Sequence, residues 1–173
     1  MQDPLSFFHP IIQKWFIEKV GEPTDIQRKS WPEIAVNKHV LISAPTGSGK
    51  TLTAFLWAIN QFAAKTWEEG ELRVLYISPL KALNNDIRRN LLKPLFEIKE
   101  YFEKEGMAFP SIHVLTRSGD TPYDERYKML RNPPEILITT PESLNIILTS
   151  ANTRRILSKV STVISFNVYP NFV

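Results

Sequence analysis

Hydrophobic residues along this chain follow two alternating spacings. Short apolar runs typical of buried β-strands, each bounded by Gly, Pro, Ser or Thr, occur at Val40–Ser43, Arg73–Ser78, Ile112–Thr116, Glu135–Thr139 and Thr162–Ser165. Longer segments with helical spacing separate these runs. The alternation predicts an α/β fold, with a mostly parallel sheet covered by helices on both faces. In such sheets ligands bind at the carboxyl ends of the strands.

Three helices and a helical prelude are predicted from spacing and end signals. The clearest helix has apolar residues at three- and four-residue steps over Leu52–Ala63. A second runs over about Leu91–Glu105 and ends at Gly106, a suitable C′ glycine. A third begins at Thr140, because Thr is a good N-cap. The prelude fills most of residues 1–36, and we expect a single domain over residues 1–173.

Composition narrows the class of protein only slightly. Of the 173 residues 43% are hydrophobic and 23% are charged, as in an average globular domain. Without a long apolar run or a signal peptide, a cytoplasmic protein with no membrane partner is expected. Cysteine is absent, which excludes disulfides, zinc ribbons and iron–sulfur clusters within these residues, and the three histidines lie far apart without metal-ligand spacing. The net charge of +3 is compatible with a polyanionic partner.

Residues 44–51 read A-P-T-G-S-G-K-T and lie between a predicted strand and a predicted helix. Gly47 and Gly49 permit a close backbone approach, so that the loop amides can form an anion nest. Lys50 can reach the β- and γ-phosphates of ATP, and the Thr51 hydroxyl can ligate Mg²⁺. The alternative is a chance glycine-rich turn. The predicted cofactors are therefore ATP and Mg²⁺, and the predicted nucleotide-binding residues of this loop are Thr46, Gly47, Ser48, Gly49, Lys50 and Thr51.

Residues 44–51 thus have the pattern of a P-loop, and four further segments occur with it along the chain. They are G-E-P-T-D-I-Q at 21–27, S-P-L-K-A-L at 78–83 with Asp86 after it, R-S-G-D-T-P at 117–122 and T-T-P-E-S-L at 139–144. They resemble the Q motif, motif Ia, the glycine-containing loop after the third strand and motif Ib of superfamily 2 helicases. The last three are most similar to the large helicase-related (Lhr) branch, close to the Ski2-like enzymes. The resemblance covers about residues 7–164 and implies the first RecA-like domain of a DEAD/DEAH-type ATP-dependent helicase.

The resemblance implies an adenine site upstream of the P-loop. Gln27 corresponds to the glutamine of the Q motif, whose amide can both donate to and accept from the adenine edge. Phe8 is a candidate to stack on the base. The alternative for Gln27 is a solvent-facing position on a helix.

The resemblance also implies a track for the sugar-phosphate backbone of single-stranded DNA or RNA. Lys81 and Arg117 offer positive charge, Gly119 permits close approach, and the helix start at Thr140 offers N–H groups to a phosphate. Structural roles are the alternative, because prolines can end strands and polar residues can cap turns. The predicted contact residues are Pro79, Lys81, Arg117, Gly119, Asp120, Thr140, Pro141 and Glu142.

The resemblance fails at motif II, where the family has Asp-Glu-x-His. Matched by position, Phe166 stands in place of the aspartate that holds Mg²⁺, and Asn167 in place of the glutamate that activates water. Phe cannot ligate a hard cation and Asn is not a general base. We therefore hypothesise a truncated or frame-shifted helicase sequence that binds nucleotide without hydrolysing it efficiently. One alternative is a non-enzymatic module that binds nucleotide or nucleic acid. Another is a small P-loop kinase, which would leave Gln27, Lys81 and the Thr140 segment unexplained.

Overall fold

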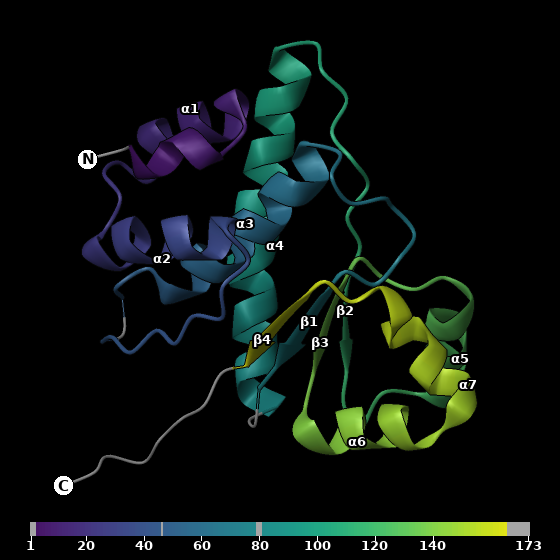
Figure 1. The fold of residues 1–173 in the computed structure, drawn as a ribbon. Coiled ribbons are helices and arrows are strands. Elements are labelled where there is room, and N and C mark those ends of the chain that lie inside the picture. Colours follow the sequence, from purple (N-terminus) through teal and green to yellow (C-terminus); the bar gives the residue numbers. More distant parts are fainter. Residues whose placement is uncertain (1–2, 46, 79–80, 166–173) are drawn as a thin grey trace, which may run out of the picture. The chain divides into compact units, whose positions relative to one another are not determined.

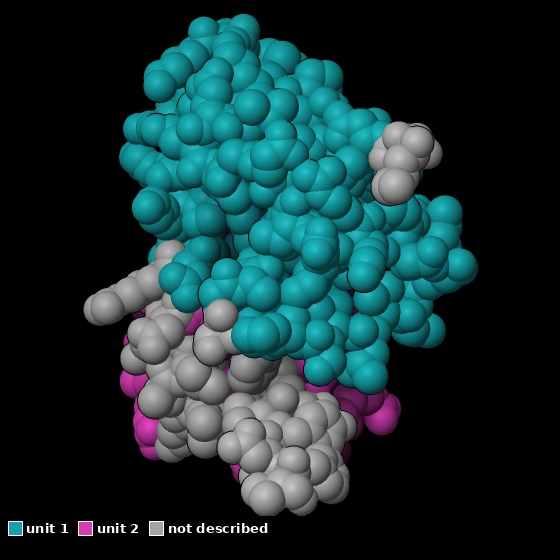
Figure 2. All heavy atoms as spheres, turned by 90° about the vertical axis from the view of Figure 1, so that its left-hand side faces the viewer, with its two compact units in different colours: residues 1–66, 90–110 teal, residues 67–89, 111–173 magenta. Residues whose placement is uncertain are grey.

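The computed structural model describes residues 3–45, 47–78 and 81–165, with the backbone alone for residues 81–86 and 89. The chain forms two compact units, drawn as a ribbon in Figure 1 and coloured separately in Figure 2. Unit 1 comprises Met1–Thr66 and Asn90–Pro110, and unit 2 comprises Trp67–Arg89 and Ser111–Val173. The single-domain organisation over residues 1–173 stays a prediction.

Unit 1 is helical, in agreement with the helical prelude and the apolar helix predicted after the P-loop. Its elements are the 3-10 helix η1 (Pro4–Phe7), the α-helices α1 (Pro10–Lys19), α2 (Asp25–Ala35) and α3 (Lys50–Ala63), and the second part of α4 (Lys81–Lys104). Large aromatic rings form its core. Trp31 is fully buried, with ring centroids 4.7 Å from Phe8 and 5.5 Å from Phe16. The Trp31 indole N–H donates to the Thr53 carbonyl at 3.1 Å, which ties α2 to the first turns of α3.

Polar pairs join α1 to the second part of α4. The Trp15 indole donates to Glu97 at 3.0 Å, and Lys14 pairs with Glu105 at 2.7 Å. The Tyr101 hydroxyl donates to Glu18 at 2.6 Å, and this hydrogen bond, aided by burial, raises the pKa of Tyr101 to about 12. The prelude is therefore fixed to the rest of unit 1 by both apolar and polar contacts.

The end of α4 agrees with the sequence, whereas its beginning does not. Gly106 has φ +68°, and its N–H and that of Met107 donate to the Glu103 and Phe102 carbonyls, which is a Schellman motif. The helix begins at Lys81, ten residues before the predicted start at Leu91. Those ten residues are mostly polar and precede Pro94, so that they lacked the apolar stripe on which the prediction rested.

The predicted strand at Val40–Ser43 is wrong. Residues 40–45 form neither helix nor strand, and the side chain of Leu41 is 92% exposed. A strand exists only through hydrogen bonds to a neighbouring strand. The strand pairs of the described residues do not include this segment, so its apolar pattern alone did not make it a strand.

Unit 2 is built on a parallel sheet that confirms the other four predicted strands. The strands are β1 (Val74–Ile77), β2 (Val114–Arg117), β3 (Ile136–Thr139) and β4 (Thr162–Ser165), in the order β2-β3-β1-β4. The described pairs are all parallel, with Ile77 opposite Thr139 and Arg117 also opposite Thr139 at the carboxyl ends. β3 is buried along its whole length, as expected for an inner strand of a parallel sheet.

Helices flank the sheet, and three of them lie together on one face in Figure 1. They are α5 (Tyr123–Arg131), α6 (Pro141–Thr149) and α7 (Ala151–Arg154), which continues into the 3-10 helix η2 (Arg155–Lys159). A buried cluster joins them to the strands: Leu72, Leu75, Met129, Leu137, Ile147 and Ile156. The start of α6 at Thr140 is confirmed, because the Thr140 hydroxyl accepts from the Ser143 N–H at 3.3 Å. Within the described residues, no helix is long and apolar enough to cross a membrane.

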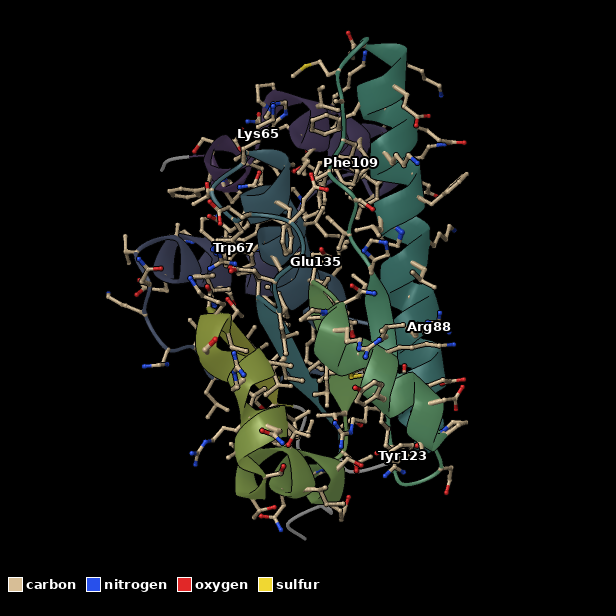
Figure 3. All side chains as sticks on the ribbon, turned by 90° about the vertical axis from the view of Figure 1, so that its right-hand side faces the viewer. Lys65, Trp67, Arg88, Phe109, Tyr123 and Glu135 are labelled. Atoms are coloured by element: carbon tan, nitrogen blue, oxygen red, sulfur yellow. The ribbon has the colours of Figure 1, made fainter. Side chains whose placement is uncertain are left out.

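The two ends of the sheet differ in chemistry. At the amino end, Glu135 is 1% exposed and accepts backbone N–H groups from Gly70 at 2.6 Å and His113 at 2.7 Å. Figure 3 places Glu135 and Tyr123, the first residue of α5, toward opposite ends of unit 2. The loop that leads into α5 therefore lies at the carboxyl end of the strands, where α/β proteins bind ligands.

Candidate nucleotide site and nucleic-acid-contacting loops

The P-loop has the backbone geometry of an anion-binding loop. Gly47 and Gly49 have φ +82° and +86°, in the left-handed region that favours glycine. Gly49 is the N-cap of α3 and provides no side-chain cap, so the first N–H groups of α3 face the loop without a capping side chain. Unpaired N–H groups and the positive end of a helix dipole attract anions. A phosphate is therefore a suitable ligand for this loop.

The reactive side chains of the P-loop lie in the first turn of α3. The Lys50 ammonium donates to the carbonyl oxygens of Ala44 and Pro45, the latter at 2.5 Å. The ammonium thus lies within the turn, where a phosphate oxygen could replace these carbonyls. Ser48 closes the turn by donating its hydroxyl to the Pro45 carbonyl at 2.8 Å, and Thr51 is half-buried. Thr46 lies outside the described residues.

The Q-motif segment contacts the P-loop directly. Thr24 and Gln27 form a capping box at the start of α2, in which the Gln27 side-chain oxygen accepts the Thr24 N–H at 2.9 Å. The Thr24 hydroxyl also donates to the Ser48 carbonyl at 3.1 Å. Gln27 is 1% exposed, and its amide nitrogen lies 3.0 Å from the point where a Cβ on Gly49 would lie. The solvent-facing alternative for Gln27 is therefore wrong.

Phe8 has a packing role in this structure. Its ring is 3% exposed and lies edge-to-face with Trp31 and with Trp57, at centroid distances of 4.7 and 5.9 Å. Stacking on a base would require the ring to leave this packing. The stacking role inferred for Phe8 therefore finds no support in its position, because a sequence does not distinguish a core ring from a ring that lines a site.

Acidic metal ligands do not accompany the P-loop in the described residues, where no group of three or more His, Cys, Asp and Glu side chains could hold a metal ion. His9 caps α1, and its ring nitrogen accepts the Ile11 N–H at 3.3 Å. If a magnesium ion enters with the nucleotide, phosphate oxygens and the Thr51 hydroxyl could hold it. The chemistry of the loop fits that mode, since the glycines and the helix start are suited to the phosphates.

The loop after β2 brings two arginines together. Arg117 is 4% exposed, and one nitrogen of its guanidinium, Nη1, is buried without a hydrogen-bond partner in the described part of the chain. Burial, and then the neighbouring charge of Arg126, lower the pKa of Arg117. The Arg126 side chain donates to carbonyl oxygens of the turn formed by residues 118–121. Gly119 and Asp120 of this turn are exposed.

A side-chain hydrogen bond connects the carboxyl ends of β2 and β3. The Thr139 hydroxyl donates to the Arg117 carbonyl at 2.9 Å, and Thr140 begins α6 directly after β3. Pro141 and Glu142, in the first turn of α6, are exposed. The structure thus brings Arg117 and the start of α6 to one edge of the sheet.

Some predicted residues lie outside the described part. Pro79, Phe166 and Asn167 are among them, and for Lys81 only the backbone is described, as the first residue of α4. The contacts made by Thr24 and Arg126 were not predicted from the sequence. The capping-box pattern T-x-x-Q at 24–27 could have identified Thr24. No local pattern signals Arg126, because its partners lie five to eight residues away in a loop.

The sequence of residues 24–165 matches the DEAD/DEAH box helicase family, and the chain therefore belongs to this family. Within the family it is similar to Lhr helicases. It is 48% identical over 168 residues to the Lhr helicase/probable uracil glycosylase of Mycolicibacterium smegmatis, a match covering 96% of this chain and 11% of that protein. It is also 48% identical over 161 residues to the ATP-dependent helicase Lhr-Core protein 2 of Thermococcus barophilus, covering 91% of this chain and 19% of that protein. The chain thus spans about a tenth to a fifth of the length of these curated relatives.

Solved structures confirm the RecA-like fold. The structure of Mycobacterium smegmatis helicase Lhr bound to ssDNA and AMP-PNP superposes with a TM-score of 0.88 at 49% identity, covering 95% of this chain and 21% of that one. The yeast DEAD-box splicing factor Prp28 superposes with a TM-score of 0.71 at 19% identity, covering 93% and 37%, which shows the fold alone. The resemblance inferred from the motifs is therefore confirmed at the level of family and fold.

Proposed function

We propose that this chain binds ATP together with Mg²⁺, as the first motor domain of an Lhr-type superfamily 2 helicase. The observation that carries the proposal is the join between the Q-motif segment and the P-loop. The Thr24 hydroxyl donates a hydrogen bond to the Ser48 carbonyl at 3.1 Å, and the buried Gln27 amide lies against Gly49. A segment suited to an adenine and a loop suited to phosphates are thus in direct contact within unit 1.

Each P-loop group has a distinct task in this proposal. The loop amides and the first N–H groups of α3 hold the phosphate oxygens, and Lys50 supplies a point charge to the β- and γ-phosphates. Thr51 offers its hydroxyl to Mg²⁺, which neutralises charge on the phosphates when bound. Gln27 selects adenine if its amide nitrogen turns from Gly49 toward the base, since its oxygen is already occupied by the Thr24 N–H.

We also propose that unit 2 of this chain binds nucleic acid. The loop after β2 and the start of α6 hold the backbone of a single strand, through Arg117 and the helix N–H groups at Thr140. The Lhr structure from Mycobacterium smegmatis is bound to ssDNA and AMP-PNP, which favours single-stranded DNA and an adenine nucleotide as the ligands to test first. Contacts of this kind position a strand without reading its bases, and they weaken as salt increases.

We further propose that the 173-residue polypeptide hydrolyses ATP at a negligible rate. At the motif II positions it has Phe166 and Asn167, which provide neither a carboxylate for Mg²⁺ nor a base for the attacking water. These two residues also favour the second candidate function, a non-enzymatic module that binds nucleotide or nucleic acid.

Equilibrium binding of a fluorescent ATP analogue with Mg²⁺ tests the nucleotide site. Lys50→Ala should weaken binding about tenfold or more, because hydrogen bonds to charged groups contribute about 1.5–3 kcal/mol. Lys19→Ala is a matched control, since it removes the same charge from the exposed end of α1. Equal binding by the wild type and Lys50→Ala would exclude the assigned site.

Phosphate release, measured at saturating ATP and Mg²⁺ with and without a single-stranded oligonucleotide, separates the two candidates. A rate no higher than that of the Lys50→Ala variant supports a binding module. Oligonucleotide-stimulated release that depends on Lys50 would instead identify the polypeptide as an ATPase despite Phe166 and Asn167.

A further inference from the structure

Arg126, on the first turns of α5, holds the loop that precedes its own helix. Its Nε donates to the Thr121 carbonyl at 2.6 Å, and its Nη2 donates to the Gly119 carbonyl at 2.6 Å and the Ser118 carbonyl at 3.5 Å. The planar guanidinium presents donors in a fixed fork, which can span several carbonyl oxygens. A lysine ammonium is a point charge and does not provide this geometry.

Hydrogen bonds between the turn's own residues also hold it closed. The Ser118 N–H donates to the Thr121 hydroxyl at 2.9 Å, and the Thr121 N–H donates to the Ser118 carbonyl at 3.2 Å. The turn is thus fixed on one side by Thr121 and on the other by Arg126. Gly119 and Asp120, at its tip, face solvent.

The turn directly follows Arg117, whose guanidinium has an unsatisfied hydrogen-bond donor. Arg117 is 4% exposed, its Nη1 is buried without a partner in the described residues, and the positive charge of Arg126 acts on it. Leaving a buried donor unsatisfied costs about 1–3 kcal/mol. A phosphate that reached the Arg117 guanidinium would satisfy the donor and offset the two like charges.

We propose that Arg126 is a positioning residue for nucleic-acid binding, which fixes the turn of residues 118–121 so that Arg117 can contact one phosphate of the strand. This inference rests on the proposed nucleic-acid track. Arg126 acts through its hydrogen bonds to the turn and not as an additional phosphate-binding charge. For nucleic-acid binding, the planar shape of the Arg126 guanidinium therefore matters more than its charge.

The test is binding of a fluorescently labelled single-stranded DNA oligonucleotide to the 173-residue chain at several salt concentrations. Arg126→Lys and Arg126→Ala should both weaken binding, by about fivefold, which lies within the range of about twofold to a hundredfold typical of coupled neighbours. Arg126→Lys should also reduce the slope of log affinity against log salt by about one, as loss of one phosphate contact does, although the net charge is unchanged. In the Arg117→Ala background, Arg126→Lys should have little further effect.

Two controls separate positioning from a general loss of structure. Arg131→Lys and Arg131→Ala alter an exposed arginine on the same helix, whose guanidinium lies 4.7 Å from the Tyr127 ring, and Arg131→Lys should leave the slope unchanged. Thr121→Val loosens the same turn without altering an arginine and should reproduce the loss caused by Arg126→Lys. The melting temperature and the binding of the ATP analogue to unit 1 report whether each variant is folded.

The outcomes distinguish this inference from the function on which it rests. If Arg117→Ala weakens binding but Arg126→Lys binds with the affinity and slope of the wild type, the positioning role is refuted and the track stands. If the wild type does not bind, or Arg117→Ala binds equally well, the track itself is refuted.

Discussion

A methyl group added at Gly49 would test the join between the P-loop and the Q-motif segment. In Gly49→Ala the new Cβ would lie 3.0 Å from the Gln27 amide nitrogen and 3.7 Å from the Thr24 hydroxyl. The nitrogen would have to move by a few tenths of an ångström, although Gln27 is 1% exposed and its oxygen holds the Thr24 N–H. We therefore expect strain in the capping box as well as in the backbone.

The loss of stability expected for Gly49→Ala is worked out by comparison with Gly47→Ala. Both glycines have a positive φ, so alanine at either costs about 1–2 kcal/mol in the backbone. Apart from its chain neighbours, a Cβ on Gly47 has no atom of the described residues within 4 Å, whereas that on Gly49 also disturbs one hydrogen bond, which adds about 1 kcal/mol. Effects of alanine on the unfolded chain are common to both variants and cancel in the comparison.

Thermal unfolding monitored by circular dichroism measures the difference. Gly49→Ala should melt about 2–4 °C below Gly47→Ala, which is the shift expected for 1 kcal/mol in a chain of this size. In a Gln27→Ala background the two variants should have equal melting temperatures. Equal melting temperatures in the wild-type background would refute the close contact between Gln27 and Gly49.

Two further predictions concern stability. Ile147→Ala should destabilise the chain by about 2–5 kcal/mol in urea unfolding, because Ile147 is fully buried in the cluster of unit 2. Its neighbour Ile146 is 50% exposed, and Ile146→Ala should change stability by about 0.5 kcal/mol or less; similar losses for both would contradict the described packing of α6. The hydrogen bond from Lys14, and then its charge, lower the pKa of Glu105 from its ordinary 4.5. The stabilisation is therefore present above that value and lost as the pH falls through the lowered pKa, so Glu105→Gln should lower the melting temperature near neutral pH and have a diminishing effect in acid. A difference that persists unchanged at low pH would contradict the ion pair.

Much of the fold was predictable from the sequence, because spacing and end signals are local. The stripe over residues 52–63, the Schellman glycine Gly106 and the N-cap Thr140 are each determined by a few neighbouring residues. The segment at residues 40–43 has the pattern of a strand, but strand formation depends on a partner elsewhere in the chain. Helix α5 was not predicted, because its sequence is mostly charged and polar, with few apolar side chains to form a stripe.

The candidate site was predictable in its motifs but not in its contacts. The P-loop glycines were identified because their spacing reflects a backbone requirement. The packing of Phe8 between two tryptophans and the burial of Gln27 depend on how helices meet, which spacing does not specify. The three carbonyl oxygens held by Arg126 depend on the path of a loop.

Titration of the chain with a fluorescent ATP analogue and Mg²⁺, with the Lys50→Ala variant in parallel, tests the central claim most directly. We expect saturable binding by the wild type that is displaced by unlabelled ATP and is about tenfold weaker or more in Lys50→Ala. Binding of equal strength by both proteins, or no displaceable binding by the wild type, would contradict the assignment of the P-loop as a nucleotide site.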